Sequence, residues 1–313
     1  MRLRRPRSRG LGAAVLGAVL AVSACSGTGV VAPPTIASPT PSAYRSLPLD
    51  GTAFGVSYGF GAAWVQVDPP VDQVVKVDAT TNTITMRVEG GRNSAIGEDA
   101  VWVPAGDRGL LKIDPGSSEV LMTVKVDASY VSLGAGAAWV PFEGGVVRVS
   151  AKSGKIRTIR VSGLDAPKSV RATPDGVWLA NKGGSVFRVD PATNQVVTEI
   201  KTGAGAHDIL VTEGAVWVTN YQANTVSRID PRTNKVVATI EGVGSGVGIA
   251  FCDGSVWVSK LAEGIYRIDP STNAAELAIP SLENLYGLAC GDGELWISSA
   301  SSTTPRVFRV PLP

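Results

Sequence analysis

Short runs in which apolar and polar residues alternate fill the chain from residue 43 to residue 313. The runs are rich in Val, Ile and Thr and are bounded by Gly, Pro, Asn or Asp. Alternation with a period of two indicates strands with one buried face, and the bounding residues are typical of tight turns. No segment of this region has a helical period long enough to compete. The pattern therefore predicts an all-β fold.

The runs belong to a repeat of about 39 residues that is marked by tryptophan. The seven tryptophans of the chain are Trp64, Trp102, Trp139, Trp178, Trp217, Trp257 and Trp296. A complete repeat holds four strand-like runs, which in the fifth copy cover residues 207–212, 215–219, 225–230 and 235–241. Four short strands per repeat are typical of one blade of a β-propeller. The sequence predicts seven four-stranded blades, with the tryptophans packed in the core between them.

Most repeats place an aspartate at the turn before the last strand, often in a segment such as Asp190-Pro191-Ala192-Thr193-Asn194. Pro presets the backbone angle of a turn, and Asp or Asn bonds the backbone nearby. The recurrent aspartates are Asp78, Asp114, Asp190, Asp230 and Asp269. Because they recur at one place, we interpret them as turn formers rather than as a metal site.

The ends of the chain complement each other. The last repeat reaches Pro313 without a fourth strand, and residues 43–49 occupy the register of a fourth strand ahead of the first repeat. An open propeller would expose unpaired strand edges. We therefore predict that residues 43–49 complete the last blade and close the ring.

Two phrases of the fifth repeat, Val218-Thr219-Asn220 and Arg228-Ile229-Asp230, carry a resemblance to known repeats. They resemble the YVTN-type propeller repeats and those of the virginiamycin B lyase family. The resemblance covers residues 43–313 and implies a propeller architecture. For the lyase family it also implies a site of two histidines and a glutamate around a magnesium ion.

The first residues have the features of an export signal. Five arginines precede an apolar run over residues 11–22 that is too short to span a bilayer. The run ends in Val22-Ser23-Ala24-Cys25, which resembles the lipobox of bacterial lipoproteins and implies that Cys25 is lipidated. Residues 1–24 are thus predicted to be a signal peptide. We expect a lipid-anchored protein on the extracytoplasmic face of the cell membrane.

Residues 25–42 follow as a tether rich in Pro, Ser and Thr, which leaves residues 43–313 as the folded domain. Five of the 29 Lys and Arg residues and none of the 27 Asp and Glu residues lie in the predicted signal peptide. The rest has 24 basic and 27 acidic residues, a net charge of about −3, so we expect no nucleic-acid partner.

Candidate chemistry lies where the repeats differ, at the start of the innermost strand, which lines the mouth of the central channel. The position ten residues before each tryptophan holds Phe54, Arg92, Ser129, Lys168, His207, Val247 and Tyr286. The next position holds Gly55, Asn93, Tyr130, Ser169, Asp208, Gly248 and Gly287. Three residues after the tryptophans, Asn181, Asn220 and Lys260 are possible neighbours. A mixed rim of cations, amides and aromatic rings suits an anionic or polar ligand.

From these columns we select as the ligand-binding rim Arg92, Asn93, Tyr130, Lys168, His207, Asn220, Lys260 and Tyr286. His207 is the only histidine of the chain, and with Asp208 it forms the candidate catalytic pair. The matching positions in neighbouring blades hold Lys168 and Val247, which departs from the pattern that the lyase family implies. We therefore predict no metal site and no cofactor.

Cys252 and Cys290 fall five and six residues before Trp257 and Trp296, in adjacent repeats. In an oxidising compartment they would bridge blades six and seven. The offset of one residue would instead point them to opposite faces, as buried free thiols. The sequence leaves both alternatives open.

Two classes of function remain. We favour a monomeric binding module that captures a polar small molecule or an envelope protein on its channel rim. The alternative is an enzyme, a lyase or hydrolase of lactones or cyclic esters that uses His207, Asp208 and magnesium.

Overall fold

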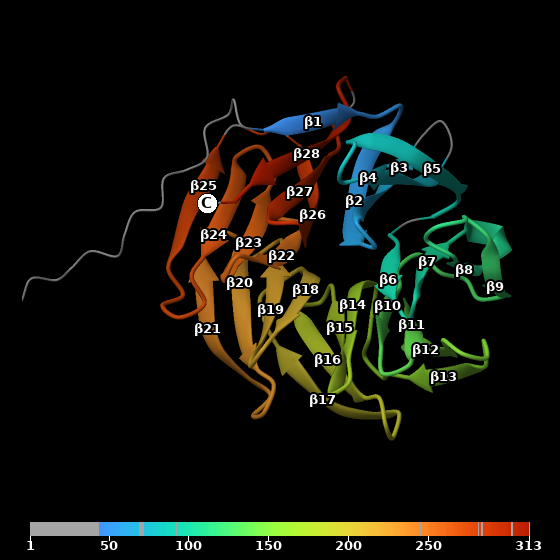
Figure 1. Cartoon of the computed structure of the whole chain (residues 1–313). Helices are drawn as coiled ribbons and strands as arrows, with labels where there is room; N and C mark the ends of the chain where they lie inside the picture. Colours follow the sequence, from blue (N-terminus) through green and yellow to red (C-terminus); the bar gives the residue numbers. More distant parts are fainter. Residues whose placement is uncertain are drawn as a thin grey trace, which may run out of the picture. The chain divides into compact units, whose positions relative to one another are not determined.

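Strands account for nearly all the regular structure of the protein in this computed structural model (Figure 1). The structure describes residues 44–68, 72–91, 93–244, 246–280, 282, 284–301 and 303–312. The predicted signal peptide, Cys25 and the tether lie outside the described residues, as does Arg92. The described part has one short 3-10 helix, η2 (Gly106–Arg108). It holds no helix with the length and apolar character that crossing a membrane requires.

The described residues form seven antiparallel sheets of four strands, arranged as blades around a ring (Figure 1). We number the blades 1 to 7 by their innermost strands, which are β2 (Thr52–Gly59), β6 (Ala95–Gly97), β10 (Ser132–Gly134), β14 (Pro167–Thr173), β18 (Ala206–Thr212), β22 (Ile249–Cys252) and β26 (Leu285–Gly291). The second strands are β3 (Ala62–Asp68), β7 (Ala100–Pro104), β11 (Ala137–Phe142), β15 (Gly176–Asn181), β19 (Ala215–Asn220), β23 (Ser255–Lys260) and β27 (Glu294–Ser299).

The third strands are β4 (Gln73–Asp78), β8 (Leu110–Ile113), β12 (Gly145–Ser150), β16 (Ser185–Asp190), β20 (Thr225–Asp230), β24 (Gly264–Ile268) and β28 (Arg306–Pro311). The outermost strands are β5 (Thr83–Glu89), β9 (Val120–Val124), β13 (Ile156–Arg160), β17 (Gln195–Lys201), β21 (Lys235–Glu241), β25 (Ala275–Pro280) and β1 (Arg45–Pro48). The predicted seven-bladed propeller is thereby confirmed.

The hydrophobic core lies between neighbouring blades. All seven tryptophans are at most 3% exposed, and each sits on the second strand of its blade. The buried clusters join residues of two adjacent blades; one, for example, contains Trp139 of blade 3 together with Val177 and Leu179 of blade 4. The prediction that the tryptophans are core residues is confirmed.

A basic side chain on the third strand covers the tryptophan and reaches the next blade. The Arg188 guanidinium lies 4.9 Å from the Trp178 ring centroid. It donates to the Pro231 carbonyl at 2.6 Å and to Asn234 Oδ1 at 2.8 Å. Arg148 and Arg228 make the same contacts one blade earlier and one blade later. The Asp-Pro turn of one blade is thus the docking point for the arginine of the blade before it.

The recurrent aspartates act within those turns. Asp190 Oδ1 accepts the Ala192 N–H at 2.7 Å and the Thr193 N–H at 3.2 Å. These backbone hydrogen bonds stabilise the carboxylate and lower the pKa of Asp190. Asp78 and Asp114 make equivalent contacts, which confirms the interpretation as turn formers.

The ring is closed by the N-terminal strand, as predicted. β1 pairs antiparallel with β28 and completes the sheet of blade 7 in the order β26-β27-β28-β1. The Leu49 N–H donates to the Pro305 carbonyl at 2.9 Å. Arg309 of β28 is buried and donates from Nε to Glu294 Oε2 of β27 at 2.7 Å. Arg45 of β1 pairs with the same carboxylate.

A disulfide joins Cys252 of β22 to Cys290 of β26, with a Cα–Cα separation of 5.4 Å. Of the two alternatives that the sequence leaves open, the structure has the bridge between blades 6 and 7. The innermost strands of neighbouring blades lie close enough that the offset of one residue does not separate the two thiols.

Candidate ligand-binding cavity at the channel mouth

Bulges at the start of the innermost strands present side chains to the channel. The pairing of β18 with β19 shifts register between Ala206 and Ile209, so that His207 and Asp208 fall inside the irregularity. The same shift occurs between Ala53 and Val56 in β2, between Leu285 and Leu288 in β26, and between Pro167 and Ser169 in β14. A bulge interrupts the alternation of a strand and redirects its side chains. Neighbouring residues can therefore both face the channel.

A polar side chain on the second strand holds the bulge in several blades. In blade 5, Thr219 Oγ1 accepts the Asp208 N–H at 3.0 Å. In blade 7, Ser298 Oγ accepts the Gly287 N–H at 2.8 Å and donates to the Phe54 carbonyl of blade 1 at 3.1 Å. The amide N–H groups left unpaired by the bulge thus find acceptors inside the protein, as buried N–H groups require.

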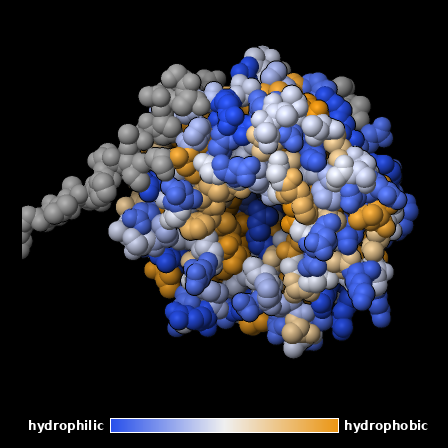
Figure 2. Space-filling view, in the orientation of Figure 1, coloured by the Kyte–Doolittle hydropathy of each residue, from blue (hydrophilic) through white to orange (hydrophobic). Residues whose placement is uncertain are grey.

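These side chains enclose a cavity of about 360 Å³. Figure 2 shows the hollow at the centre of the ring, with hydrophilic residues inside it and hydrophobic residues along part of its edge. The lining consists of Phe54, Gly55, Val56, Gln66, Asp68, Asn93, Tyr130, Lys168, Ser169, Arg171, His207, Asp208, Val247, Tyr286, Gly287 and Leu288. A cavity of this size is at the small end of the range for ligand pockets.

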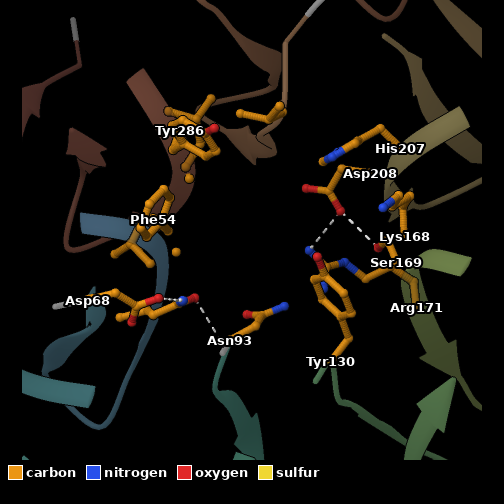
Figure 3. Close-up of a pocket in the computed structure, with 16 residues that line it drawn as sticks. Phe54, Asp68, Asn93, Tyr130, Lys168, Ser169, Arg171, His207, Asp208 and Tyr286 are labelled. Carbon is orange, nitrogen blue, oxygen red and sulfur yellow. Dashed lines mark hydrogen bonds and ion pairs between the residues drawn. The ribbon is translucent and has the colours of Figure 1, made fainter. Parts of the chain in front are cut away.

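Most of the rim predicted from the sequence comes together here. The structure places Asn93, Tyr130, Lys168, His207 and Tyr286 in the lining, together with Asp208 (Figure 3). Ser129 and Gly248, which belong to the same two columns, do not line the cavity. The positions ten and nine residues before each tryptophan thus predict where the cavity lies.

Asn220 and Lys260 do not line the cavity, although we selected them for the rim. Both end a second strand, and each side chain is held by contacts away from the cavity. Asn220 is fully buried and donates from Nδ2 to Thr225 Oγ1 and Ser227 Oγ, both at 2.9 Å. Lys260 pairs with Glu263 at 2.7 Å and donates to the Gly242 carbonyl at 2.9 Å.

Asn181, the third neighbour from that column, is likewise buried outside the lining. Its Nδ2 donates to Ser185 Oγ at 3.1 Å. The column three residues after the tryptophan therefore serves contacts within and between strands rather than the channel.

The sequence reasoning missed five lining residues: Val56, Gln66, Asp68, Arg171 and Leu288. The signal for Arg171 was strand alternation, because it lies two residues after Ser169 and so on the same face.

Gln66 stands two residues after Trp64, where later repeats have the hydroxyl residues that hold the bulge. Its Oε1 accepts the Asn93 N–H of the next blade at 3.0 Å, and its Nε2 donates to Asp68 Oδ2 at 3.1 Å.

The Asp208 carboxylate is already compensated by its surroundings. Its Oδ1 accepts the Ser169 hydroxyl at 2.9 Å and the Ile209 N–H at 2.8 Å, and lies 3.6 Å from Arg171 Nη2. Arg171 is fixed in turn by a hydrogen bond from Nε to the Ile209 carbonyl at 2.8 Å. Asp208 and Arg171 therefore form a nearly neutral pair.

His207 is the titratable group that the site perturbs most clearly. Burial lowers its pKa below the ordinary value of 6.5, the Asp208 carboxylate opposes this shift, and the Lys168 ammonium adds to it. Its Nδ1 is buried without a hydrogen-bond partner among the described residues. A protonated imidazole would have to bury an unpaired N–H there, so we expect a neutral ring with its proton on Nε2.

Lys168 faces the cavity beside His207 (Figure 3). Among the described residues no carboxylate lies within ion-pair distance of its ammonium group. The lysine therefore differs from Arg171, whose charge Asp208 balances. The cavity thus contains an ammonium group that no carboxylate of the described residues balances at ion-pair distance.

The residues around His207 do not fit a magnesium ion. Magnesium takes octahedral oxygen ligands, and proteins usually hold it through one or two carboxylates while it keeps several waters. Asp208 Oδ1 already accepts two hydrogen bonds and pairs with Arg171, and the nearby side chains of Lys168 and Arg171 are cations. In the described part of the chain, no three His, Cys, Asp or Glu side chains are grouped so that they could hold a metal ion. We therefore derive no metal chemistry at this site.

A family model described as a domain of unknown function, DUF5074, matches residues 152–288, which is less than half of the chain. No curated protein matches the chain.

Solved structures share the architecture at low sequence identity. The β-propeller domain of Cps50 (Swd1) from Myceliophteria thermophila has a TM-score of 0.68 at 12% identity, over 85% of this chain and 98% of its own. BamB from Moraxella catarrhalis has a TM-score of 0.57 at 12% identity, over 83% and 86%. The WD40 domain of Pan2 from Neurospora crassa has a TM-score of 0.68 at 10% identity, over 84% and 90%. At these identities the likeness shows the β-propeller fold alone.

Proposed function

We propose that this protein is a binding module that holds a small polar ligand in the cavity at the mouth of its channel. The observation that carries the proposal is the convergence of Lys168, His207 and Asn93, from three different blades, on one cavity of about 360 Å³. Concave sites with a few convergent polar groups are the usual form of ligand pockets.

The rigidity of the site supports the same proposal. The bulges that present the lining are fixed by Thr219 and Ser298, which are fully buried. A site whose backbone is held by such contacts loses little conformational entropy when a ligand binds. The module is in this respect preorganised.

We further propose that the module works on the outer face of the cell membrane, tethered through a lipid on Cys25. The support is the lipobox-like segment over residues 22–25 and the Pro-rich tether that follows it. The test is fractionation of cells that carry the wild type or Cys25→Ser. The wild type should remain with the membranes until detergent is added, and the variant should not. Equal fractionation of both would contradict the anchor.

Blocking the cavity tests the binding proposal. Val247 lines the cavity, and Val247→Phe would fill part of it. The matched control is Val237→Phe on the outer strand β21, where the side chain is 58% exposed. Thermal unfolding of the full chain is measured with a library of small polar and amphipathic compounds. A compound at about a hundred times its dissociation constant adds about 2.7 kcal/mol to the free energy of unfolding.

Compounds that stabilise the wild type should also stabilise Val237→Phe but not Val247→Phe. Equal stabilisation of all three proteins would place binding elsewhere and contradict the proposal. A library without any stabilising compound would also contradict it.

A further inference from the structure

The cavity has two chemically different arcs. Blades 6, 7 and 1, which are contiguous around the closed ring, contribute its aliphatic side chains and two aromatic rings: Phe54, Val56, Val247, Tyr286 and Leu288. Blade 1 also contributes Gln66 and Asp68. Blades 2 to 5 contribute no aliphatic side chain; their residues are polar or charged, with one tyrosine ring: Asn93, Tyr130, Lys168, Ser169, Arg171, His207 and Asp208. Figure 3 shows Phe54 and Tyr286 facing Lys168, His207 and Asp208 across the cavity.

The apolar arc is built around an aromatic pair. The rings of Phe54 and Tyr286 meet edge to face, with centroids 5.2 Å apart and planes at 88°. Both side chains remain partly exposed although they lie in the channel. Covering exposed aromatic surface with an apolar group is favourable, and aromatic rings prefer this kind of offset or edge contact with another ring.

Glycine explains why this arc is so closely packed. A Cβ on Gly287 would lie 2.8 Å from the Val56 amide nitrogen and 3.0 Å from Ser298 Oγ. A Cβ on Gly248 would lie 2.2 Å from the Tyr286 carbonyl oxygen. The innermost strands of blades 6, 7 and 1 therefore approach one another more closely than larger residues allow, which sets Phe54 and Tyr286 against each other.

Among the described residues of the polar arc, Lys168 supplies a positive charge without a counter-ion and His207 supplies a neutral donor. Asp208 balances Arg171 at 3.6 Å. Lys168 has no counter-ion among the described residues, as shown above, and a neutral His207 with its proton on Nε2 donates but adds no charge. Asp68 lies on the other side of the cavity, where Gln66 donates to it.

From these two arcs we infer the class of ligand: a small amphipathic anion, with one carboxylate and an apolar body about the size of a ring. This inference rests on the proposed function and deepens it. The carboxylate lies toward Lys168 and His207, and the body lies against Phe54 and Tyr286. The cavity volume fits a small molecule of this kind.

Four related probes separate the two parts of the inference. Phenylacetate has the ring and the anion, phenylacetamide has the ring without the charge, phenethylamine has the ring with a positive charge, and acetate has the anion without the ring. Calorimetric titration of the full chain should give the highest affinity for phenylacetate. We expect phenylacetamide to bind about tenfold or more weakly, because a charged hydrogen bond is replaced by a neutral one.

Lys168→Met tests the residue that carries the charge, and Lys182→Met is its matched control. Lys182 is an exposed lysine of the same blade that does not line the cavity. The preference for phenylacetate over phenylacetamide should disappear in Lys168→Met and persist in Lys182→Met.

Equal affinity for phenylacetate and phenylacetamide in the wild type, or tighter binding of phenethylamine, would overturn the anionic class. Binding of acetate as tight as that of phenylacetate would overturn the apolar body. If no probe binds while another compound stabilises the wild type but not Val247→Phe, the ligand class is wrong and the proposed function stands. If no compound of any kind distinguishes those two proteins, the proposed function fails as well.

Discussion

At the scale of single residues, the location of His207 follows from the sequence repeat, whereas its burial and its pKa follow from the folded structure. The repeat register is enough to place this residue at the channel mouth. Its burial follows from the bulge between Ala206 and Ile209 and from the neighbouring strands, which the sequence does not reveal. The lowered pKa favours the neutral form of His207 at pH 7.

This environment predicts how stability depends on pH. The pKa of His207 in the folded protein lies below the unfolded value of 6.5. As the pH falls through 6.5, the unfolded chain takes up a proton before the folded protein does, so the free energy of unfolding decreases. The decrease ends when the pH passes the pKa of the folded state.

Urea unfolding of the wild type and His207→Gln between pH 7.5 and pH 5 measures this effect. Since His207 is the only histidine, the variant removes the only histidine contribution over this range. We expect the wild type to lose more stability than His207→Gln as the pH falls. Parallel pH profiles would show that burial does not perturb the histidine.

At the scale of strands and turns, the strands of each blade were predictable because the same pattern of apolar, polar and turn residues occurs in seven copies. In the fifth blade the expected runs differ from the observed strands by one residue at Ala206 and one at Asn220. The bulges were not predictable, because the residues that form them vary from blade to blade. The hydroxyl groups two residues after tryptophan accept hydrogen bonds from the bulges. This role can be recognised only when the pairing of the first and second strands is known.

Thr219 offers a test of how the bulge is held. Thr219→Val keeps the shape of the side chain but leaves the Asp208 N–H without its acceptor at 3.0 Å. An unpaired buried donor costs about 1–3 kcal/mol, so we expect a loss of this size in the free energy of unfolding, together with weaker binding of phenylacetate.

Thr239→Val on the outer strand β21 is the matched control, because Thr239 is exposed. It should change stability by less than about 0.5 kcal/mol and leave binding unaltered. If the two substitutions had the same effect, the hydroxyl of Thr219 would not be what holds the bulge.

At the scale of the whole molecule, the contacts that close the ring gather at blades 6, 7 and 1. The strand β1 completes blade 7, and the disulfide ties blade 7 to blade 6. Ring closure by residues 43–49 could be predicted from the complementary ends of the repeat array. The disulfide could not, because the spacing of the two cysteines is compatible with either face of a strand. The two arcs of the cavity could not be predicted either, because they depend on which blades become neighbours when the ring closes.

Removing the disulfide should weaken the fold measurably. The bond spans 38 residues, for which the entropy of loop closure corresponds to about 4 kcal/mol. We expect the double variant Cys252→Ala, Cys290→Ala to lose about 2–4 kcal/mol in chemical unfolding. A reductant should bring the wild type down to the stability of the double variant and leave the variant unchanged. A wild type that does not respond to reductant when unfolded would contradict the bridge.

The central claim is that the channel cavity is a ligand site, and the imidazole of His207 is its most direct reporter. As the only histidine, it gives one Cε1–H signal in a ¹H–¹³C NMR spectrum of the full chain. We predict that this signal shifts to saturation as phenylacetate is added to the wild type, and that it does not shift in Val247→Phe. A His207 signal that stays fixed in the wild type, or that shifts equally in Val247→Phe, would contradict the assignment of the cavity as the binding site.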